Sequence, residues 1–315
     1  MAIPREQPAL PEDALPRYPQ AILVSCEIPW DEKEQLLEDV FRREVRWVLA
    51  AGFNHLYVFG TAGEGYAVDT ARFQDIVRLF WEETQGPDVH PMVGVIALST
   101  AQFVERLGFA HDAGFRTFQI CLPSWGALND AEVDTFFTDV CGAFPDSRFL
   151  HYNLGRAKRL LTGRDYRRIA DRVPNLAATK NTLTSAADLL RHAPDLQHFL
   201  GERNFAEGCL YGECSLLASL GLTIPHRIKA YFAAGVRGDI DRLFRLHHDL
   251  LRFQQDIIEP LVAESRIDGA YDKALVKMGG FDAMPLRLLS PYQGLSDTHY
   301  EYVHSLFRDL YPDWS

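Results

Sequence analysis

Two residues near the ends of short apolar segments could carry nucleophilic and acid–base chemistry. Tyr152 lies in the run 149–153, and Lys180 directly follows the run 176–179, with a helical pattern over residues 163–172 between them. A strand, a helix and a second strand in this order predict a βαβ unit with two parallel, adjacent strands. Both side chains would then lie at the carboxyl ends of neighbouring strands, where α/β folds build their active sites.

The alternation of side chains along each strand places the two groups on the same face. Leu150 and Tyr152 share one face of the first strand, and Ala178 and Lys180 share one face of the second. Burial disfavours the charged ammonium, so it lowers the pKa of a lysine and frees its amine as a nucleophile. A surface lysine that starts a loop is the alternative, and from this unit alone it is the more common case. His151 faces the helices, which favours a core histidine over a catalytic base.

The composition limits the classes of protein to which the chain can belong. Its 315 residues, 47% of them apolar, are enough for one large domain or two modest ones. A net charge of −11 argues against nucleic acid or an anionic membrane as the main partner. No apolar stretch is long enough to span a bilayer, and residues 1–19 carry proline and charge, so we expect a cytoplasmic protein. The five cysteines are scattered without metal-ligand spacing, so no metal is expected.

Eight apolar runs, each followed by a helical pattern, occupy most of the chain. They predict a parallel sheet, and eight repeats favour a closed (β/α)₈ barrel, an α/β fold, over an open sheet. The expected barrel spans residues 20–238, after a proline-rich lead-in at 1–19, and its first helix is expected over 31–51. Residues 239–315 are interpreted as a C-terminal extension of three helices, at about 239–262, 268–279 and 296–310. The eight expected strands are 21–26, 55–59, 91–96, 117–122, 149–153, 176–179, 196–200 and 214–218.

A glycine-rich loop at residues 60–66 follows the second expected strand. Its pattern is G-x-x-G-x-G, but it lacks the acidic residue at a strand end about 20 residues later that a dinucleotide fold requires. A better interpretation is a tight turn whose backbone N–H groups and Thr61 hydroxyl bind a small carboxylate. A turn that needs glycine only for its geometry is the alternative. No glycine-rich phosphate cradle follows the seventh or eighth strand, which argues against a phosphosugar isomerase.

Three short motifs together resemble the dihydrodipicolinate synthase/N-acetylneuraminate lyase family of class I aldolases and dehydratases. Residues 60–64, Gly-Thr-Ala-Gly-Glu, resemble the family's G-[ST]-[ST]-G-E turn after the second strand. Tyr152 and Asn153 resemble its Y-N pair after the fifth strand, and residues 180–182, Lys-Asn-Thr, resemble its K-[DE]-[ST] signature after the sixth. The order and spacing of the motifs are specific, and the resemblance covers about residues 20–300.

The resemblance implies an enzyme that uses no metal and no organic cofactor. Lys180 would attack the ketone of a 2-oxo acid such as pyruvate and form an imine, and Tyr152 would act as general acid and base. Thr61, with the backbone N–H groups of Ala62 and Gly63, would hold the substrate carboxylate. The glutamate that ends the turn would hold the turn itself. Family members are commonly oligomers, so a homotetramer or homodimer is expected.

The chain departs from the family pattern at several positions. Ala62 replaces the second hydroxyl residue of the turn, which removes one hydrogen bond worth about 1 kcal/mol. Trp125 stands where synthases have a tyrosine that relays protons, and tryptophan has no acidic hydroxyl. Ala157 stands where synthases have an arginine, with Arg156 beside it as a cation for a second carboxylate. Trp125, Arg156 and Leu217, the last of these in the eighth apolar run, are the further substrate contacts that we predict.

These departures argue against a dihydrodipicolinate synthase that uses aspartate semialdehyde. We predict a Schiff-base lyase that releases pyruvate by retro-aldol cleavage or dehydrates a 2-keto-3-deoxy sugar acid, in both cases through an imine on Lys180. A condensing enzyme with an altered acceptor is one alternative. A catalytically weakened member that binds a 2-oxo acid as a sensor or structural subunit is another, because of Ala62 and Trp125. Filling a subunit interface is an equally good interpretation of Trp125.

Overall fold

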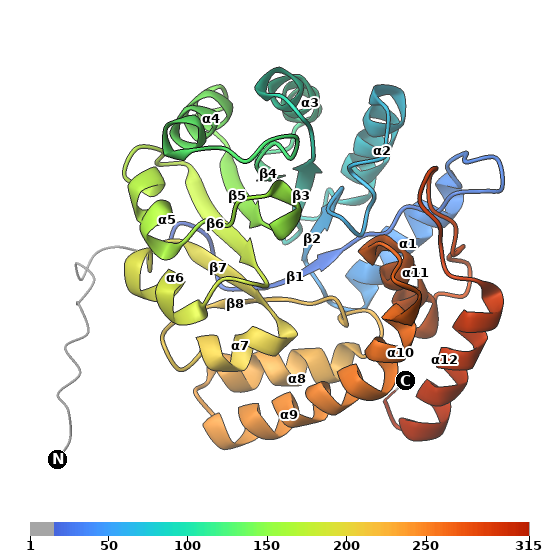
Figure 1. Cartoon of the computed structure of the whole chain (residues 1–315). Coiled ribbons are helices and arrows are strands. Elements are labelled where there is room, and N and C mark those ends of the chain that lie inside the picture. The colour runs from blue at the N-terminus through green and yellow to red at the C-terminus, as the bar shows by residue number, and fades with distance from the viewer. Residues whose placement is uncertain (1–15, 315) are drawn as a thin grey trace, which may run out of the picture.

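Eight parallel strands close into a barrel in the computed structural model, which describes residues 16–314 (Figure 1). The strands follow one another around the barrel in chain order, and β1 pairs with β8 to close it. This confirms the (β/α)₈ barrel, and the observed strand ends agree with the expected ones to within two residues. The strands are β1 (Ile22–Ser25), β2 (His55–Val58), β3 (His90–Val95), β4 (Thr117–Ile120), β5 (Arg148–Asn153), β6 (Leu176–Asn181), β7 (Gln197–Gly201) and β8 (Ser215–Leu217).

A helix follows each strand and covers the outside of the barrel (Figure 1). Side-chain caps begin several of these helices: Asp69, Ser99 and Asn129 each accept a hydrogen bond from a backbone N–H of the first turn. Such caps satisfy N–H groups that have no partner within the helix. The helices are α1 (Glu38–Ala50), α2 (Thr70–Glu83), α3 (Thr100–Ala113), α4 (Asp130–Gly142), α5 (Gly163–Ala170), α6 (Ala186–His192), α7 (Glu202–Gly208) and α8 (Pro225–Val236).

The first helix starts seven residues later than the sequence predicts, at Glu38 and not at residue 31. Asp31 explains the difference, because its carboxylate accepts hydrogen bonds from the backbone N–H groups of Lys33 and Gln35, both at 2.8 Å. An aspartate that binds its own following backbone favours a turn over a helix. Glu34, inside this turn, has a φ of 59° and cannot belong to a right-handed helix.

The inside of the barrel is filled by residues that alternate with the outward-facing ones along each strand. A compact inner cluster contains Leu23, Tyr57, Met92, Leu150 and Phe199, all buried. A larger cluster fills the layer between the strands and the helices. The lower half of the barrel is therefore a packed core, and only its mouth at the strand carboxyl ends is free to bind a ligand.

The last residues of the expected lead-in close the bottom of the barrel. The hydroxyl of Tyr18 lies 3.0 Å from Nδ1 of His55 inside the barrel. Arg17 forms an ion pair with Asp195 at 2.9 Å and donates to the carbonyl of Leu176 at 3.1 Å. The rest of the expected lead-in, residues 1–15, lies outside the described residues.

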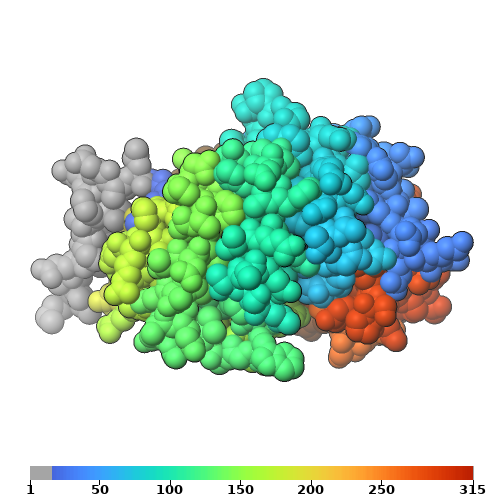
Figure 2. Space-filling model, turned by 90° about the horizontal axis from the view of Figure 1, so that it is seen from above, coloured from blue at the N-terminus to red at the C-terminus, as the bar shows by residue number. Residues whose placement is uncertain are grey.

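Helices without an intervening strand follow α8, as the sequence predicts. They are α9 (Ile240–Phe253), the short α10 (Glu259–Leu261), α11 (Asp268–Met278) and α12 (Asp297–Leu310). The helix expected over 239–262 is interrupted by a π-helical turn at Gln254–Ile258, just before Pro260, which has no N–H to continue the hydrogen-bond ladder. Figures 1 and 2 show the orange and red C-terminal segment beside the blue N-terminal part of the barrel. The boundary at residue 238 stays a prediction.

No helix within residues 16–314 is both long enough and apolar enough to cross a lipid bilayer.

A buried ion pair joins the C-terminal helices to the glycine-rich turn of the barrel. Nζ of Lys273 on α11 lies 2.6 Å from Oε1 of Glu64, and both side chains are fully buried. Glu64 also accepts hydrogen bonds from Nε1 of Trp30 at 2.8 Å and from the backbone N–H of Leu289 at 2.7 Å. Glu64 therefore joins the turn to the C-terminal segment, a connection that the sequence did not predict.

We expect Lys273→Met to lower the free energy of unfolding by about 3–5 kcal/mol, because it leaves the Glu64 carboxylate buried without its counter-charge. Lys277→Met is the matched control on the same helix, since Nζ of Lys277 donates only to the exposed carbonyl of Asp282. It should cost about 1 kcal/mol. Urea denaturation followed by circular dichroism measures both values. Equal losses in the two variants would contradict a central role for this ion pair.

Candidate active site

A cavity of about 170 Å³ opens at the carboxyl ends of the barrel strands. It combines groups from five strands, from the turn after β2 and from helix α11, so segments distant in the sequence meet there. A wider depression of about 300 Å³ lies at the other end of the barrel, near Trp81 and Arg116. In this fold the carboxyl end carries the chemistry and the other end contributes stability, so the smaller cavity is the candidate site. Its wall consists of Ser25, Tyr57, Thr61, Ala62, Tyr152, Lys180, Thr182, Leu217, Ala218, Ser219, Asp268 and Asp272.

Lys180 lies on the wall of this cavity, directly opposite Tyr152 on the neighbouring strand. The register of β5 and β6 pairs the two residues, and Nζ of Lys180 lies 4.0 Å from the centre of the Tyr152 ring. Only 3% of Lys180 is exposed. Burial lowers the pKa of Lys180 to about 8, although the negative charges of Asp272, Asp268 and Glu27 oppose this shift. A substantial fraction of the amine is therefore uncharged near neutral pH and available as a nucleophile.

Tyr152 and Thr61 both supply hydroxyl groups to the wall of the cavity. Burial raises the pKa of Tyr152 to about 12, and its hydrogen bond with the Thr61 side chain partly lowers it. The phenol therefore carries its proton at neutral pH and can donate it as a general acid. Thr61 and Ala62 are both buried and line the cavity through the glycine-rich turn.

Gly63, in contrast, does not reach the cavity wall. A Cβ at this position would lie 2.8 Å from the backbone nitrogen of Phe59 and 3.1 Å from the carbonyl oxygen of Cys26. The glycine is needed because the turn packs directly against backbone. Phe59 itself has a φ of 65°, a conformation that costs free energy for a bulky side chain. The turn is thus held in an unfavourable shape by its surroundings, which agrees with a preorganised binding loop.

Of the three further substrate contacts that the sequence predicts, Leu217 lies on the cavity wall, whereas Trp125 and Arg156 do not. The side chain of Trp125 is 82% exposed on the loop after β4, and its carbonyl accepts a hydrogen bond from Nζ of Lys158 at 2.6 Å. Arg156 forms two hydrogen bonds of 2.9 Å with the carboxylate of Asp268. The guanidinium that was predicted to bind a second carboxylate of the substrate is already paired with a carboxylate of the protein.

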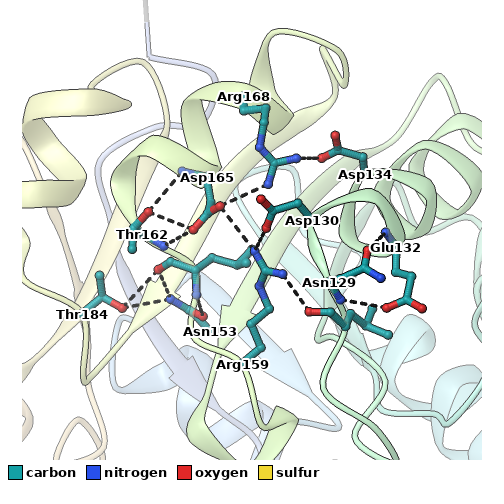
Figure 3. Close-up of polar contacts among 12 residues, drawn as sticks. Asn129, Asp130, Glu132, Asp134, Asn153, Arg159, Thr162, Asp165, Arg168 and Thr184 are labelled. Carbon is teal, nitrogen blue, oxygen red and sulfur yellow. Dashed lines mark hydrogen bonds and ion pairs between the residues drawn. The ribbon is translucent and has the colours of Figure 1, made fainter.

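Asn153, next to Tyr152, ties the end of β5 to the loops around it (Figure 3). Its side-chain Nδ2 donates to the carbonyl of Leu161 at 2.8 Å, to Oδ1 of Asn181 at 3.0 Å and to Thr184 at 3.0 Å. The backbone N–H of Leu161 donates back to Oδ1 of Asn153 at 2.9 Å. The asparagine of the Y-N pair thus fixes the strand ends that carry Tyr152 and Lys180.

The loop after β5 is held by a second group of polar contacts, also drawn in Figure 3. Arg159 donates to the carboxylate of Asp130 at 2.5 Å and to the carbonyl of Leu128 at 2.7 Å. It also lies 3.5 Å from the carboxylate of Asp165. Together with Arg156, this arginine connects the loop to its neighbours, so the basic run at 156–159 is largely used within the protein.

His151 points away from the cavity, as its position in the strand predicts. Its Nδ1 lies 2.7 Å from the hydroxyl of Tyr166, and its ring packs against the edge of Phe137. Burial lowers the pKa of His151 to about 3, so the imidazole is neutral. It is a core residue.

The sequence analysis missed Tyr57, which contacts Lys180 most directly. The hydroxyl oxygen of Tyr57 accepts a hydrogen bond from Nζ of Lys180 at 2.8 Å. The alternation of side chains along β2 could have predicted this position. Tyr57 shares its strand face with His55, and that face points into the barrel. Gly60 makes room for this ring, since a Cβ there would lie 2.5 Å from Tyr57.

Asp268 and Asp272 were also missed as cavity residues. They are four residues apart on α11, so they lie on one face of the helix, and this face is turned toward the barrel mouth. Burial raises the pKa of Asp272 well above its usual value, and the nearby Glu27 and Asp268 raise it further. No sequence pattern indicates that a helix so far along the chain covers the mouth.

Within residues 16–314 the structure contains no group of three or more histidine, cysteine, aspartate or glutamate side chains arranged to hold a metal ion.

Comparisons with known proteins agree with this fold and these motifs. Residues 19–309 match the model of the Dihydrodipicolinate synthetase family. The N-acetylneuraminate lyase of Salmonella paratyphi B is 23% identical over 231 residues, which cover 72% of this chain and 77% of that protein.

Solved structures of similar proteins share the whole fold. YagE, a prophage protein of the dihydrodipicolinic acid synthase family from E. coli K12 solved with pyruvate, has a TM-score of 0.82 and 17% identity, covering 92% of this chain and 98% of that chain. The N-acetylneuraminate lyase from Fusobacterium nucleatum has a TM-score of 0.78 and 17% identity, with the same coverage of 92% and 98%. The family match extends over almost the entire length. The chain therefore belongs to the dihydrodipicolinate synthetase family, and it is a lyase of the dihydrodipicolinate synthase/N-acetylneuraminate lyase type.

Proposed function

We propose that this protein is a class I aldolase or dehydratase that acts on pyruvate or a 2-keto-3-deoxy sugar-acid-like 2-oxo acid through an imine on Lys180. The observation that carries the proposal is the buried amine of Lys180, with its pKa near 8, on the wall of a small cavity. A lysine in this state attacks ketones at neutral pH without a cofactor. The covalent imine on Lys180 then supplies the electron sink.

The proposed reaction uses three side chains in named roles. The uncharged amine of Lys180 attacks the ketone carbon. The ketone oxygen takes up one proton that the amine loses and a second proton from the Tyr152 hydroxyl, and it leaves as water. The resulting iminium withdraws electrons when the next bond, carbon–carbon or carbon–oxygen, is broken. Tyr152 carries protons to and from the reacting atoms. Thr61 and the backbone N–H group of Ala62 hold the substrate carboxylate, and Leu217 packs against the substrate.

The polar groups of the cavity support a sugar-acid-like substrate. Beyond Lys180 the wall carries the hydroxyl groups of Thr182 and Ser219 and the carboxyl groups of Asp268 and Asp272. Such groups form hydrogen bonds with substrate hydroxyls, but none of them offers a positive charge to a second substrate carboxylate. The nearby cation, Arg156, is already paired with Asp268. The volume of about 170 Å³ also favours a small substrate.

Borohydride trapping tests the imine directly. Incubation with pyruvate and borohydride should add a reduced pyruvate adduct to Lys180 of the wild-type protein, read by intact-mass and peptide mass spectrometry. Lys180→Ala should abolish the adduct because it removes the amine that we propose attacks the ketone. Lys158→Ala, which removes an exposed lysine on the loop after β5, should leave the adduct unchanged. The proposal falls if the wild type forms no adduct with pyruvate or with longer 2-oxo acids.

The proton transfer assigned to Tyr152 can be measured without the natural substrate. An enamine of pyruvate exchanges its methyl protons with D₂O, so proton NMR follows the reaction. Tyr152→Phe should slow this exchange by about 10²- to 10⁴-fold while the borohydride adduct still forms. Tyr166→Phe, which changes a phenol behind β5 that contacts His151, is the matched control. Exchange at the wild-type rate in Tyr152→Phe would remove Tyr152 from the mechanism.

The expected homotetramer or homodimer stays a prediction. Trp125 and Leu183 lie on loops at the barrel mouth with 82% and 65% of their surface exposed. Apolar groups at such positions are typical of contacts between subunits. Light scattering should give the mass of two or four chains, and a mass of one chain would contradict the prediction.

A further inference from the structure

Helix α11 is fixed against the glycine-rich turn at two points. A Cβ on Gly269 would lie 3.1 Å from the carbonyl oxygen of Ala62 and 3.3 Å from that of Thr61, so the start of the helix packs directly on the backbone of the turn. One helical turn later, Nζ of Lys273 lies 2.6 Å from Oε1 of Glu64 in the same turn. The segment between these two points therefore keeps a defined position beside the residues that we propose bind the substrate carboxylate.

Asp272 belongs to this segment and is part of the cavity wall. The other carboxyl group on the wall, that of Asp268, is already engaged, because its two oxygens accept hydrogen bonds of 2.9 Å from Arg156. Asp272, in contrast, forms no hydrogen bond and no ion pair with another residue in the described range 16–314. Its carboxyl group is therefore available to a substrate in the cavity.

Electrostatic effects indicate that Asp272 is close to the reacting amine and holds a proton. Among the charged groups that raise the pKa of Lys180, Asp272 has the largest effect, and such effects weaken with distance. Burial raises the pKa of Asp272 itself well above its usual value, and Glu27 and Asp268 raise it further, whereas Lys180 lowers it. The protonated carboxyl group is thus favoured, and this form can donate a proton.

The other polar groups of the wall are less suited to protonate a leaving group. Ser25, Thr182 and Ser219 present aliphatic hydroxyl groups, which are not among the usual general acids. The phenol of Tyr57 is a weaker acid than a carboxyl group, and its oxygen already accepts a hydrogen bond from Lys180 at 2.8 Å. A free carboxyl group is therefore the best proton donor that the cavity offers.

We propose that Asp272 is a second catalytic acid, which protonates the hydroxyl group that leaves the substrate from the carbon next but one to the imine carbon. The role rests on the imine chemistry proposed above, and it selects dehydration over retro-aldol cleavage. Retro-aldol cleavage requires a base that removes the proton of this hydroxyl group, whereas dehydration requires an acid that supplies one. Tyr152 then serves the imine and the carbon beside it, and Asp272 serves the leaving group.

The proton transfers balance over one turnover. Tyr152, which has given its proton during imine formation, removes a proton from the carbon beside the iminium, so a C–H bond breaks and a neutral enamine forms. The enamine electrons form a new C=C bond as the C–O bond of the next carbon breaks. The departing oxygen takes the proton of Asp272 and leaves as water. Hydrolysis of the unsaturated iminium releases the product, the free amine of Lys180 and one proton, which returns to Asp272.

Single-turnover mass spectrometry tests this step on the enzyme itself. The protein is mixed with 2-keto-3-deoxygluconate or 2-keto-3-deoxyarabinonate and quenched with borohydride after increasing times. The intact mass distinguishes three adducts: the complete sugar acid, the sugar acid less one water, and the pyruvate left by retro-aldol cleavage. The wild type should pass from the first adduct to the second. Asp272→Asn should make this conversion about 10²- to 10⁴-fold slower, because an amide is not a general acid.

Pyruvate reports on the rest of the site in the same variants. Asp272→Asn should form the pyruvate adduct and exchange its methyl protons at least as fast as the wild type, because any negative charge on Asp272 raises the pKa of Lys180 and its removal does not. Asp272→Ser, with a smaller side chain that also lacks the carboxyl group, should show the same selective loss. Asp297→Asn changes an exposed carboxyl group at the start of α12 and should match the wild type in every assay.

The outcomes separate the acid role from the imine proposal. Dehydration at the wild-type rate in either Asp272 variant overturns the acid role and leaves the imine proposal standing. A wild-type adduct that stays complete, or that passes to the pyruvate adduct, does the same. Loss of the pyruvate adduct in both variants also overturns the acid role, since Asp272 would then be needed before the leaving group departs. If the wild type forms no adduct with pyruvate or with longer 2-oxo acids, the imine proposal fails, and the acid role fails with it.

Discussion

The removal of one lysine amine from water is the constraint on which the rest of the site depends. Burial lowers the pKa of Lys180, while the charges of Asp272, Asp268 and Glu27 raise it, and burial has the larger effect. A charged ammonium in this place would need a counter-ion at contact distance. The protein instead surrounds the amine with two tyrosine rings at 4.0 and 4.4 Å and with a hydroxyl oxygen at 2.8 Å. These groups accept either protonation state of the amine, as the proposed role of Lys180 requires.

The C-terminal helices are part of this arrangement. Lys273 and Leu289 bind Glu64 and so hold the glycine-rich turn, while Asp268 and Asp272 from the same helix as Lys273 form part of the cavity wall. The turn that carries Thr61 is therefore positioned by residues about 200 positions later in the chain. A barrel without these helices would leave Glu64 without Lys273 and Leu289, and it would lack the part of the cavity wall that Asp268 and Asp272 form.

The departures from the family motifs have different consequences in the structure. Ala62 still lines the cavity, so it changes the number of hydrogen bonds and not the shape of the turn. The side chain of Trp125 is exposed on the surface outside the cavity, and Arg156 is paired with Asp268. The part of the site where we propose that the imine forms thus has the motif residues Lys180, Tyr152 and Thr61, whereas the part that would recognise the rest of the substrate is built from other groups. Such a division is common in barrels, where loops vary over a constant strand framework.

The sequence by itself determined the barrel, the order of its strands and the pairing of Tyr152 with Lys180. These features follow from periods of local hydrophobicity and from the strict alternation of side chains along a strand, which short-range information is enough to reveal. Only the tertiary structure decided that Tyr57 contacts Lys180, that α11 covers the cavity and that Arg156 is paired with Asp268. These contacts join residues 123 positions apart for Tyr57 and 112 positions apart for Arg156. The two residues of each contact meet only when the barrel closes and the C-terminal helices pack against it. No local sequence pattern predicts this packing.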